Sequence, residues 1–351
     1  MAIPIEPAGE EALIADYFAP LSQDWPGSYG LKDDCASVAP APGHELVLKT
    51  DPVRAGVHFF DCDSPEDIAW KALAVNVSDL AAKSAMPLAY LLAISFPEKP
   101  EQKWLQGFSD GLRQAQEAFG CTLIGGDTDR ADGPLSIAVT VIGELPVGRM
   151  VQRGTAAPGD QLYVTGTLGD AALGLQLHAN AEPSGAWSLT NSERDFLRQR
   201  YHRPQPRLHL KRALRYFASA AMDISDGLAK DLTRMCRASG TGAEVQLDDL
   251  PRSTAMQHAL EIDPGLIEKM IAAGDDYEVL VAVPPKKSES FEAAVQAATD
   301  FPVSLAGLPS MAPVTRIGKI TAGGNVRFYC ATGQEYRLQS MGYDHFRPST
   351  A

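Results

Sequence analysis

Polar side chains that interrupt apolar segments are the residues of this sequence with the clearest chemical potential. Asn76 and Asp79 stand three residues apart within the otherwise apolar segment 71–83, so a helix there would place both on one side. A carboxylate in an apolar helix is costly unless a cation pairs with it or a metal ion binds it. Lys83 follows Asp79 by four residues and could supply an ordinary ion pair, so this segment alone leaves both explanations open.

Short aspartate-rich segments recur beside other apolar runs, and they favour the metal ion. These segments are Lys32–Cys35, Thr50–Pro52, Gly125–Thr128, Asp223–Gly227 and Gly274–Tyr277. Oxygen-only ligand clusters suit hard cations such as Mg²⁺. The sequence has no GxxxxGK[ST] phosphate loop, no GxGxxG after a strand and no GxSxG, so the familiar nucleotide-binding loops and the hydrolase elbow are excluded.

Two of these segments also have ordinary structural explanations. Gly125 and Gly126 could let a phosphate approach the backbone while Asp127 holds its metal, but a tight turn would use the same residue types. Ser225 or Asp226 could simply cap a following helix, although a cap needs only one oxygen and this segment supplies three side chains.

Composition and charge narrow the class of protein. The chain has 351 residues, 45% of them hydrophobic and 21% charged, which is typical of a globular protein with two domains. A formal net charge of −13 argues against a nucleic-acid partner. The absence of a long apolar run and of a signal-like N-terminus predicts a cytoplasmic protein without a membrane partner. Five cysteines without a CxxC pair indicate free thiols.

Strands and helices alternate in both halves of the sequence, which predicts α/β or α+β domains. Strands are expected at 35–38, 45–50, 87–96, 121–124, 135–143, 161–165, 221–224, 243–247, 277–283 and 302–308. Helices are expected at 9–19, 65–83, 101–119, 170–178, 191–201, 206–219, 226–239, 263–273 and 285–299. A glycine- and proline-bearing joint near 148–159 predicts domains at 1–147 and 148–346, with a tail at 347–351.

The ordered set of motifs resembles the thiamine-monophosphate kinase family, which belongs to the aminoimidazole-ribonucleotide-synthetase-like superfamily. The resemblance covers about residues 9–346. The segments that carry it are, in order, Asp33–Ala36, Thr50–Asp51 with His58–Phe59, Ala74–Ala81, Ile124–Thr128, Gly148–Arg149 with Arg153, Asp223–Leu228, Asp276–Glu278 and Gly342–Phe346. Each motif is weak alone, whereas their order is specific.

The resemblance implies an N-terminal β-sheet domain that is flanked by helices and builds a barrel in a homodimer, followed by a C-terminal α/β domain. It also implies ATP-dependent phosphorylation of thiamine monophosphate to thiamine diphosphate with several Mg²⁺ ions. The implied metal ligands are Asp34, Thr50, Asp51, Asp79, Asp127, Asp223 and Asp226. The implied ATP contacts are Gly126, Asp127, Arg153 and Ser225, and the implied substrate contacts are His58, Asp275 and Tyr343.

This reaction agrees with the chemistry of the motifs. ATP and a phosphomonoester bring about six negative charges together, and divalent cations must offset them where Lys and Arg are sparse. An acceptor phosphate is already nucleophilic, so we expect no general base. The alternatives are another ATP-using synthetase of the superfamily and a catalytically impaired protein that binds a nucleotide or a thiamine phosphate.

Three residues depart from the family pattern. Lys32 replaces a glycine, so it could bind a phosphate oxygen or could strain a position that needs a positive φ. Asp275 replaces a longer glutamate, and Lys49 stands where a small residue often precedes Thr50-Asp51.

Overall fold

The computed structural model describes residues 9–179, 187–299, 312–339 and 341–342. The predicted strand at 302–308 and the predicted substrate contact Tyr343 lie outside this part of the chain. The chain divides into two compact units, which are Met1–Leu80 with Ala85–Arg149 and Ala81–Ser84 with Met150–Ala351. Each unit is described by itself below.

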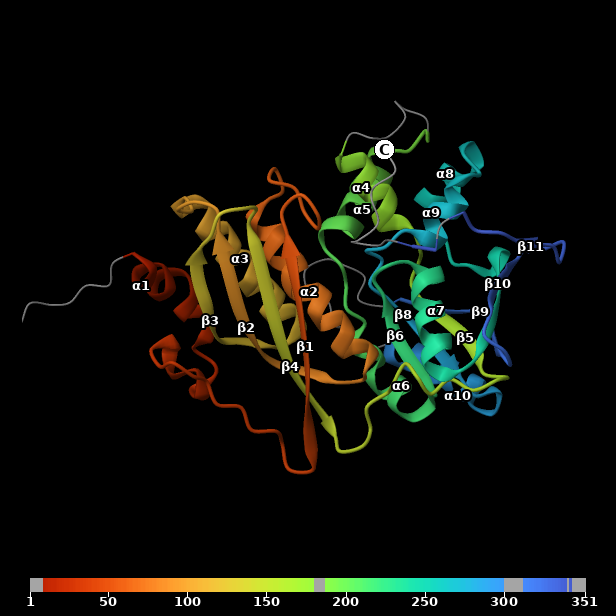
Figure 1. Ribbon diagram of the computed structural model, residues 1–351, viewed down its shortest axis with the longest axis horizontal. Coiled ribbons are helices and arrows are strands. Elements are labelled where there is room, and N and C mark those ends of the chain that lie inside the picture. Colours follow the sequence, from red (N-terminus) through yellow and green to blue (C-terminus); the bar gives the residue numbers. More distant parts are fainter. Residues whose placement is uncertain (1–8, 180–186, 300–311, 340, 343–351) are drawn as a thin grey trace, which may run out of the picture. The chain divides into compact units, whose positions relative to one another are not determined.

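The first unit is built on a four-stranded sheet whose order is β1-β4-β2-β3 (Figure 1). Its strands are β1 (His44–Arg54), β2 (Met86–Phe96), β3 (Thr122–Arg130) and β4 (Ser136–Pro146). β4 pairs antiparallel with β1 and β2, whereas β2 and β3 are parallel. Helices α2 (Pro65–Ala82) and α3 (Gln102–Phe119) pack on one face of this sheet. On the other face, which we call the open face, Trp25, Ala36 and Val38 of the N-terminal segment pack against Ala89, Ile124 and Ile142.

Helix α2 forms where the sequence predicts it, for local reasons. Ser64 Oγ accepts a hydrogen bond of 3.1 Å from the backbone N–H of Asp67, and Pro65 occupies the first turn. Leu73, Val77 and Leu80 are at most 1% exposed. The helix is apolar on every side because it is buried on every side, and its polar residues therefore need specific partners.

The N-terminal segment and the second unit both contain elements that the sequence pattern did not predict correctly. The predicted helix at 9–19 is a short helix α1 (Glu10–Leu13) that continues in π and 3₁₀ turns to Ser22. The predicted strand at 35–38 is wrong: Ala36 and Val38 pack on Ala89, Ile124 and Ile142 through side chains, without a strand ladder. Helix α8 (Thr254–Ile262) was not predicted.

The described strands of the second unit form a mixed seven-stranded sheet with the order β11-β10-β7-β9-β5-β8-β6 (Figure 1). These strands are β5 (Gln161–Thr165), β6 (Ala220–Ile224), β7 (Gly242–Gln246), β8 (Glu278–Val283), β9 (Val314–Thr321), β10 (Val326–Tyr329) and β11 (Glu335–Tyr336). The pairs are antiparallel except for β7 with β10.

Helices cover both faces of this second sheet. The helices are α4 (Asp170–His178), α5 (Asn191–His202), α6 (Lys211–Phe217), α7 (Leu228–Ser239), α8, α9 (Leu266–Ala272) and α10 (Ser288–Thr299). One apolar core includes Leu173, Leu232 and Met270, and a second includes Leu214 and Phe291. The predicted mixed α and β fold class is therefore confirmed. In the described residues no helix combines the length and apolarity needed to cross a bilayer.

Candidate functional site

Two candidate metal ligands of the first unit meet at one lysine. Asp51 and Lys49 lie two residues apart on β1 and so face the same side of the sheet, where α2 presents Asp79. Lys49 Nζ lies 2.9 Å from Asp51 Oδ2 and 2.8 Å from Asp79 Oδ2. Burial lowers the pKa of the Lys49 ammonium, but the charges of Asp79 and Asp51 and their hydrogen bonds outweigh it, so the pKa is raised. The structure therefore supplies a lysine as the cation partner of Asp79.

Asn76 fixes the position of Asp51 relative to α2. Its side chain is 0% exposed. Asn76 Oδ1 accepts a hydrogen bond of 2.7 Å from the Asp51 N–H, and Asn76 Nδ2 donates to the carbonyls of Ala72 at 3.0 Å and Asp51 at 3.3 Å. A buried amide is stable only when its donors and acceptor are satisfied. Asn76 thus ties the backbone of Asp51 to the helix that carries Asp79.

A second group of predicted residues lines a cavity of about 680 Å³ in the first unit. Asp34, Gly126 and Asp127 contribute to its wall, and so do apolar residues such as Phe18 and Ile142. A cavity with carboxylates at one part of an apolar wall can hold a flat apolar group next to charged groups. The structure therefore brings together three of the predicted metal and ATP contacts.

Gly126 has a structural reason to be glycine. Residues 125–128 lie inside β3, so the alternative of a tight turn at Asp127 is wrong. A Cβ at Gly126 would lie 1.8 Å from the carbonyl oxygen of Leu92 on the neighbouring strand. The glycine therefore lets the backbone of β3 approach the backbone of its neighbour β2 closely.

The Asp51–Asp79 pair and the cavity lie on opposite faces of the sheet. Asp51 is opposite Val139 on β4, Val139 is opposite Leu92 on β2, and Leu92 is opposite Gly126 on β3. Three strand spacings separate Asp51 from Gly126 by roughly 14 Å. Asp127 is the next residue along β3, so its side chain points to the other face. Within the first unit these carboxylates therefore form two groups, not one cluster.

Thr50 and His58 are placed apart from the Asp51–Asp79 pair. Thr50 alternates with Asp51 along β1, and its Oγ1 accepts a hydrogen bond of 2.9 Å from Thr140 on the open face. The Thr50 hydroxyl does not join Asp51 and Asp79. His58 lies in the turn after β1, where its Nδ1 is 3.1 Å from the Arg54 backbone nitrogen.

In the second unit, the loop between β6 and α7 gathers the predicted residues Asp223, Ser225 and Asp226. Asp223 is 5% exposed at the end of β6. Asp226 Oδ2 lies 2.6 Å from Arg234 and 3.1 Å from Lys230, both on α7. Asp231 is 0% exposed, and its Oδ2 accepts hydrogen bonds from the backbone N–H groups of Ser225 at 3.0 Å and Asp226 at 2.9 Å. Asp231 therefore holds this loop.

The segment that carries Asp275 packs directly on this loop. The Asp275 N–H donates to the Ser225 carbonyl at 2.9 Å, and a Cβ at Gly274 would lie 2.2 Å from the same oxygen. Asp275 has a φ of 70°, a conformation that is costly for a residue with a Cβ. The structure therefore brings Ser225, Asp226 and Asp275 together.

Arg153 lies at the other end of α7. Its carbonyl accepts a hydrogen bond from Ser239 Oγ, at the C-terminal end of the helix, whereas Ser225 precedes the N-terminal end. A helix of 12 residues is about 18 Å long. The backbone of Arg153 is therefore distant from Ser225, and its predicted role as an ATP contact stays a prediction.

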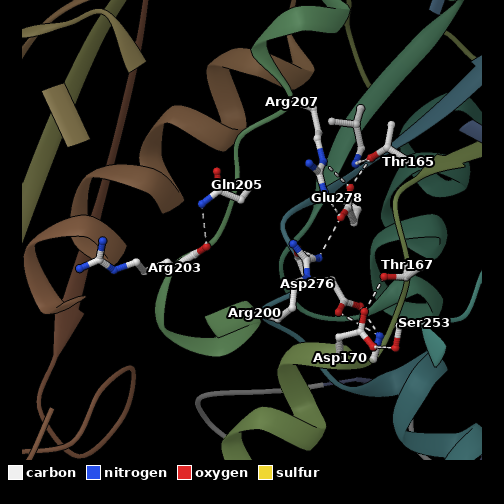
Figure 2. A network of polar contacts seen from close by, with 12 residues as sticks. Thr165, Thr167, Asp170, Arg200, Arg203, Gln205, Arg207, Ser253, Asp276 and Glu278 are labelled. Carbon is white, nitrogen blue, oxygen red and sulfur yellow. Dashed lines mark hydrogen bonds and ion pairs between the residues drawn. The ribbon is translucent and has the colours of Figure 1, made fainter. Parts of the chain in front are cut away.

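A buried ionic network surrounds Glu278, three residues after Asp275 (Figure 2). Glu278 is 0% exposed at the start of β8. Arg200 Nη2 donates to Glu278 Oε1 at 2.8 Å and to the Asp276 carbonyl at 3.2 Å. Arg207 forms a two-point pair with Glu278, in which Nε donates to Oε2 at 2.7 Å. Thr165 Oγ1 donates to Glu278 Oε2 at 2.5 Å. Every oxygen of this buried carboxylate is therefore satisfied.

The pKa values of two carboxyl groups in this network are shifted in opposite directions. Burial alone would raise the pKa of Glu278, but the charges of Arg207 and Arg200 and their hydrogen bonds hold it below its ordinary value. Asp276 accepts from the Gly169 N–H at 2.9 and 3.0 Å. Burial raises the pKa of Asp276 well above its ordinary value. Asp276 thus fixes the backbone at Gly169, whereas Glu278 carries the negative charge that pairs with Arg200 and Arg207.

Sequence reasoning missed the residues that position the site. Lys49 differs from the small residue of the family pattern, and Asp231, Arg200 and Arg207 lie outside the motifs that predict the site. Asp231 carried a usable signal, because it falls on the apolar face of α7 with Leu228 and Leu232. For Arg200 on α5 and for Arg207 in the segment after that helix no comparable signal exists, because charged residues are usually solvated.

Comparisons with known proteins agree with this arrangement. The family model "AIR synthase related protein, N-terminal domain" matches residues 32–145, and "AIR synthase related protein, C-terminal domain" matches residues 157–331. The thiamine-monophosphate kinase of Salmonella typhimurium is 39% identical over 339 residues, which are 96% of this chain and 98% of the relative.

Solved structures show the same likeness. A crystal structure of thiamine-monophosphate kinase from Stenotrophomonas maltophilia K279a is 36% identical with a TM-score of 0.75, covering 87% of this chain and 91% of that chain. A structure of AaThiL complexed with AMPPCP and TMP is 29% identical with a TM-score of 0.72, covering 91% of this chain and 97% of that chain.

Proposed function

The chain belongs to the AIR synthase related protein family, and from that premise we propose that it phosphorylates thiamine monophosphate to thiamine diphosphate with ATP. The observation that carries the proposal is its nearly full-length similarity to thiamine-monophosphate kinases. The protein is then a phosphotransferase whose acceptor is a phosphate group. We propose direct in-line transfer, because a phosphate acceptor is already nucleophilic and needs no general base.

The residues present fit Mg²⁺ as the accompanying metal. Asp51 and Asp79 aim their oxygens at one point, and the ammonium of Lys49 already stands there as a cation. We propose these two carboxylates, with Asp34, Asp127, Asp223 and Asp226, as the groups that hold several Mg²⁺ ions; the proposed contribution of Thr50 is limited to its main chain. When bound, Mg²⁺ would offset the charge of the phosphates and of the transferred group.

The protein's own residues would bind and orient the substrates. We propose that the apolar cavity beside Asp34 and Asp127 receives the nucleotide base, with Gly126 at its wall. Ser225, held by Asp231, would meet the nucleotide phosphates, and Asp275 and His58 would meet thiamine monophosphate. Asp275 is shorter than the family's glutamate, but its left-handed backbone and its contact with Ser225 set where the carboxylate begins.

One assay tests the proposed function against its alternatives. The purified protein is incubated with ATP, Mg²⁺ and thiamine monophosphate, and thiamine diphosphate and ADP are quantified. Equal amounts of both products are expected. A protein that hydrolyses ATP without forming thiamine diphosphate would be a different synthetase of the superfamily, and one that binds both ligands without turnover would be a binding protein. Either outcome contradicts the proposal.

The positive charge of Lys32 is expected to strengthen the binding of ATP. Lys32 has a φ of −109°, so the alternative that it strains a position needing positive φ is wrong. We expect Lys32→Gly to raise the KM for ATP several-fold and to steepen the Mg²⁺ requirement, because a point charge near the phosphates is lost. Lys32→Gln is the matched control, since it removes the charge without adding the flexibility of glycine. It should raise the KM for ATP as much as Lys32→Gly does. An unchanged KM in both variants contradicts the assignment.

We also propose that the protein is cytoplasmic and that it works as a homodimer. The open face of the first sheet carries Leu48, which lies on the edge strand β1, is 64% exposed and is not part of the cavity wall. Such a face is the surface expected to meet a second copy in a shared barrel. We therefore propose that two chains pair through this face.

Leu48→Arg is expected to weaken the dimer. A guanidinium placed in an apolar sheet interface loses hydration without gaining a partner, so we expect the dimer dissociation constant to rise at least tenfold. Sedimentation against protein concentration measures this shift toward the monomer mass of 37.6 kDa. Ile262→Arg, at a residue that is 55% exposed in the second unit, is the control and should leave the dimer intact. Wild-type protein that sediments as a monomer at micromolar concentration contradicts the shared barrel.

A further inference from the structure

We propose that Lys49 is a built-in counter-cation that sets the Mg²⁺ affinity of the Asp51–Asp79 pair. The inference deepens the proposed function, because it rests on the role of these two aspartates as metal ligands. Its physical basis is that one ammonium group touches both carboxylates, at 2.9 and 2.8 Å.

The ammonium of Lys49 occupies the point on which the two carboxylates converge. Each carboxylate presents its Oδ2 to Lys49 Nζ, so the two oxygens converge on a single cationic centre. A divalent ion held by Asp51 and Asp79 would need these same oxygens, and Mg²⁺ binds its oxygen ligands at about 2.0–2.1 Å. The ammonium and the ion therefore exclude each other between these oxygens.

The surroundings make this competition effective. Asn76 fixes the backbone of Asp51 against α2, and Asp79 is part of that helix, so the two carboxylates are held together without a metal ion. In the described part of the chain, the ion-pair partner of both aspartates is Lys49. The side chain of Lys49 is 31% exposed, and its flexible stem allows it to swing toward water. Mg²⁺ thus binds at this pair only as Lys49 leaves.

The consequence is a higher Mg²⁺ requirement at this pair than two free carboxylates would have. A local positive charge that is always present also keeps the two aspartates from repelling each other before metal binds. Lys49 accordingly acts as a specificity-determining residue: it admits ions of high charge density that can displace an ammonium, and it disfavours weakly bound ones.

Metal binding without nucleotide tests the inference. Mn²⁺ is added to the protein in the absence of ATP and thiamine monophosphate, and free Mn²⁺ is read from its electron paramagnetic resonance signal. We expect Lys49→Met, which keeps a long stem but removes the charge, to bind one Mn²⁺ at least tenfold more tightly than the wild type. Lys49→Arg keeps the charge and should bind as the wild type does. Lys49→Met combined with Asp79→Asn should lose the gain.

The outcomes separate this inference from the proposed function. Equal or weaker Mn²⁺ binding by Lys49→Met overturns the role of Lys49, whatever the kinase assay shows. If Lys49→Met is not folded by circular dichroism, Lys49→Gln gives the same comparison with a polar side chain. Tighter Mn²⁺ binding without any thiamine diphosphate formation would uphold the counter-cation and reject the kinase. If both hold, Lys49→Met should also reach half-maximal rate at lower Mg²⁺.

Discussion

Asp79→Asn is expected to lower turnover by about 100-fold or more while leaving the protein folded. The amide is uncharged and is a poorer ligand for Mg²⁺ than a carboxylate, and it also deprives Lys49 of one of its two ionic partners. The fold should survive because the Asp79 side chain is 27% exposed and an asparagine keeps its size and can still accept a hydrogen bond from Lys49.

The measurement is the rate of thiamine diphosphate formation as a function of Mg²⁺ concentration, with melting temperature as the check on folding. Asp110→Asn is the matched control, because Asp110 is a half-buried aspartate on α3 whose partner, Gln106, is a neutral side chain 3.1 Å away. It should retain the wild-type rate. If Asp79→Asn keeps full activity at limiting Mg²⁺, Asp79 is a structural partner of Lys49 and not a metal ligand.

Local elements of this fold could be predicted because their signals lie within a few residues. The expected helix at 170–178 and strand at 161–165 agree with α4 and β5, and the cap at Ser64 sets the start of α2. The failures have the same origin. The segment 35–38 is apolar because it packs on the first sheet, so its apolar character says nothing about strand pairing.

The arrangement of the candidate site was less predictable, because it depends on contacts between distant residues. Alternation along β1 is readable in the sequence and separates Thr50 from Asp51. That Lys49 and Asp79 meet follows only from the packing of α2 on β1. That Asp127 points away from Asp51 follows from the register of the paired strands and from the alternation of side chains along β3. The motifs thus indicated the chemistry of the aspartates but not their grouping.

The buried network was invisible for a further reason. Arg200 and Arg207 come from a charged stretch near the end of α5, and Glu278 begins a strand about 70 residues later. Such residues are most often solvated, and only the tertiary structure shows that Glu278 is fully buried between two guanidinium groups. Removing one partner of such a buried ion pair strongly destabilises the fold, because the other charge is left buried without a counter-charge.

Glu278→Gln is expected to destabilise the second unit by about 3–5 kcal/mol at neutral pH, because it leaves the buried guanidiniums of Arg200 and Arg207 without their counter-charge. A loss of this size should lower the melting temperature by roughly 10 °C in a unit of this size. Thermal or urea unfolding of the wild type and the variant measures the difference. Glu244→Gln is the control, since Glu244 also lies in this sheet but pairs with Lys319 at 3.0 Å with a side chain that is 34% exposed.

The difference between Glu278→Gln and wild type should also depend on pH in one direction. The pKa of Glu278 is held below its unfolded value, which is about 4.3, despite burial. Its contribution to stability is therefore fully present above the unfolded pKa of about 4.3 and is lost as the pH falls through the lower folded-state pKa. The two unfolding free energies should converge in acid and stay apart at pH 7. A gap that is small at pH 7, or that widens in acid, would show that Arg200 and Arg207 do not depend on the charge of Glu278, and the position of Asp275 would then have to be set by its backbone contact with Ser225 alone.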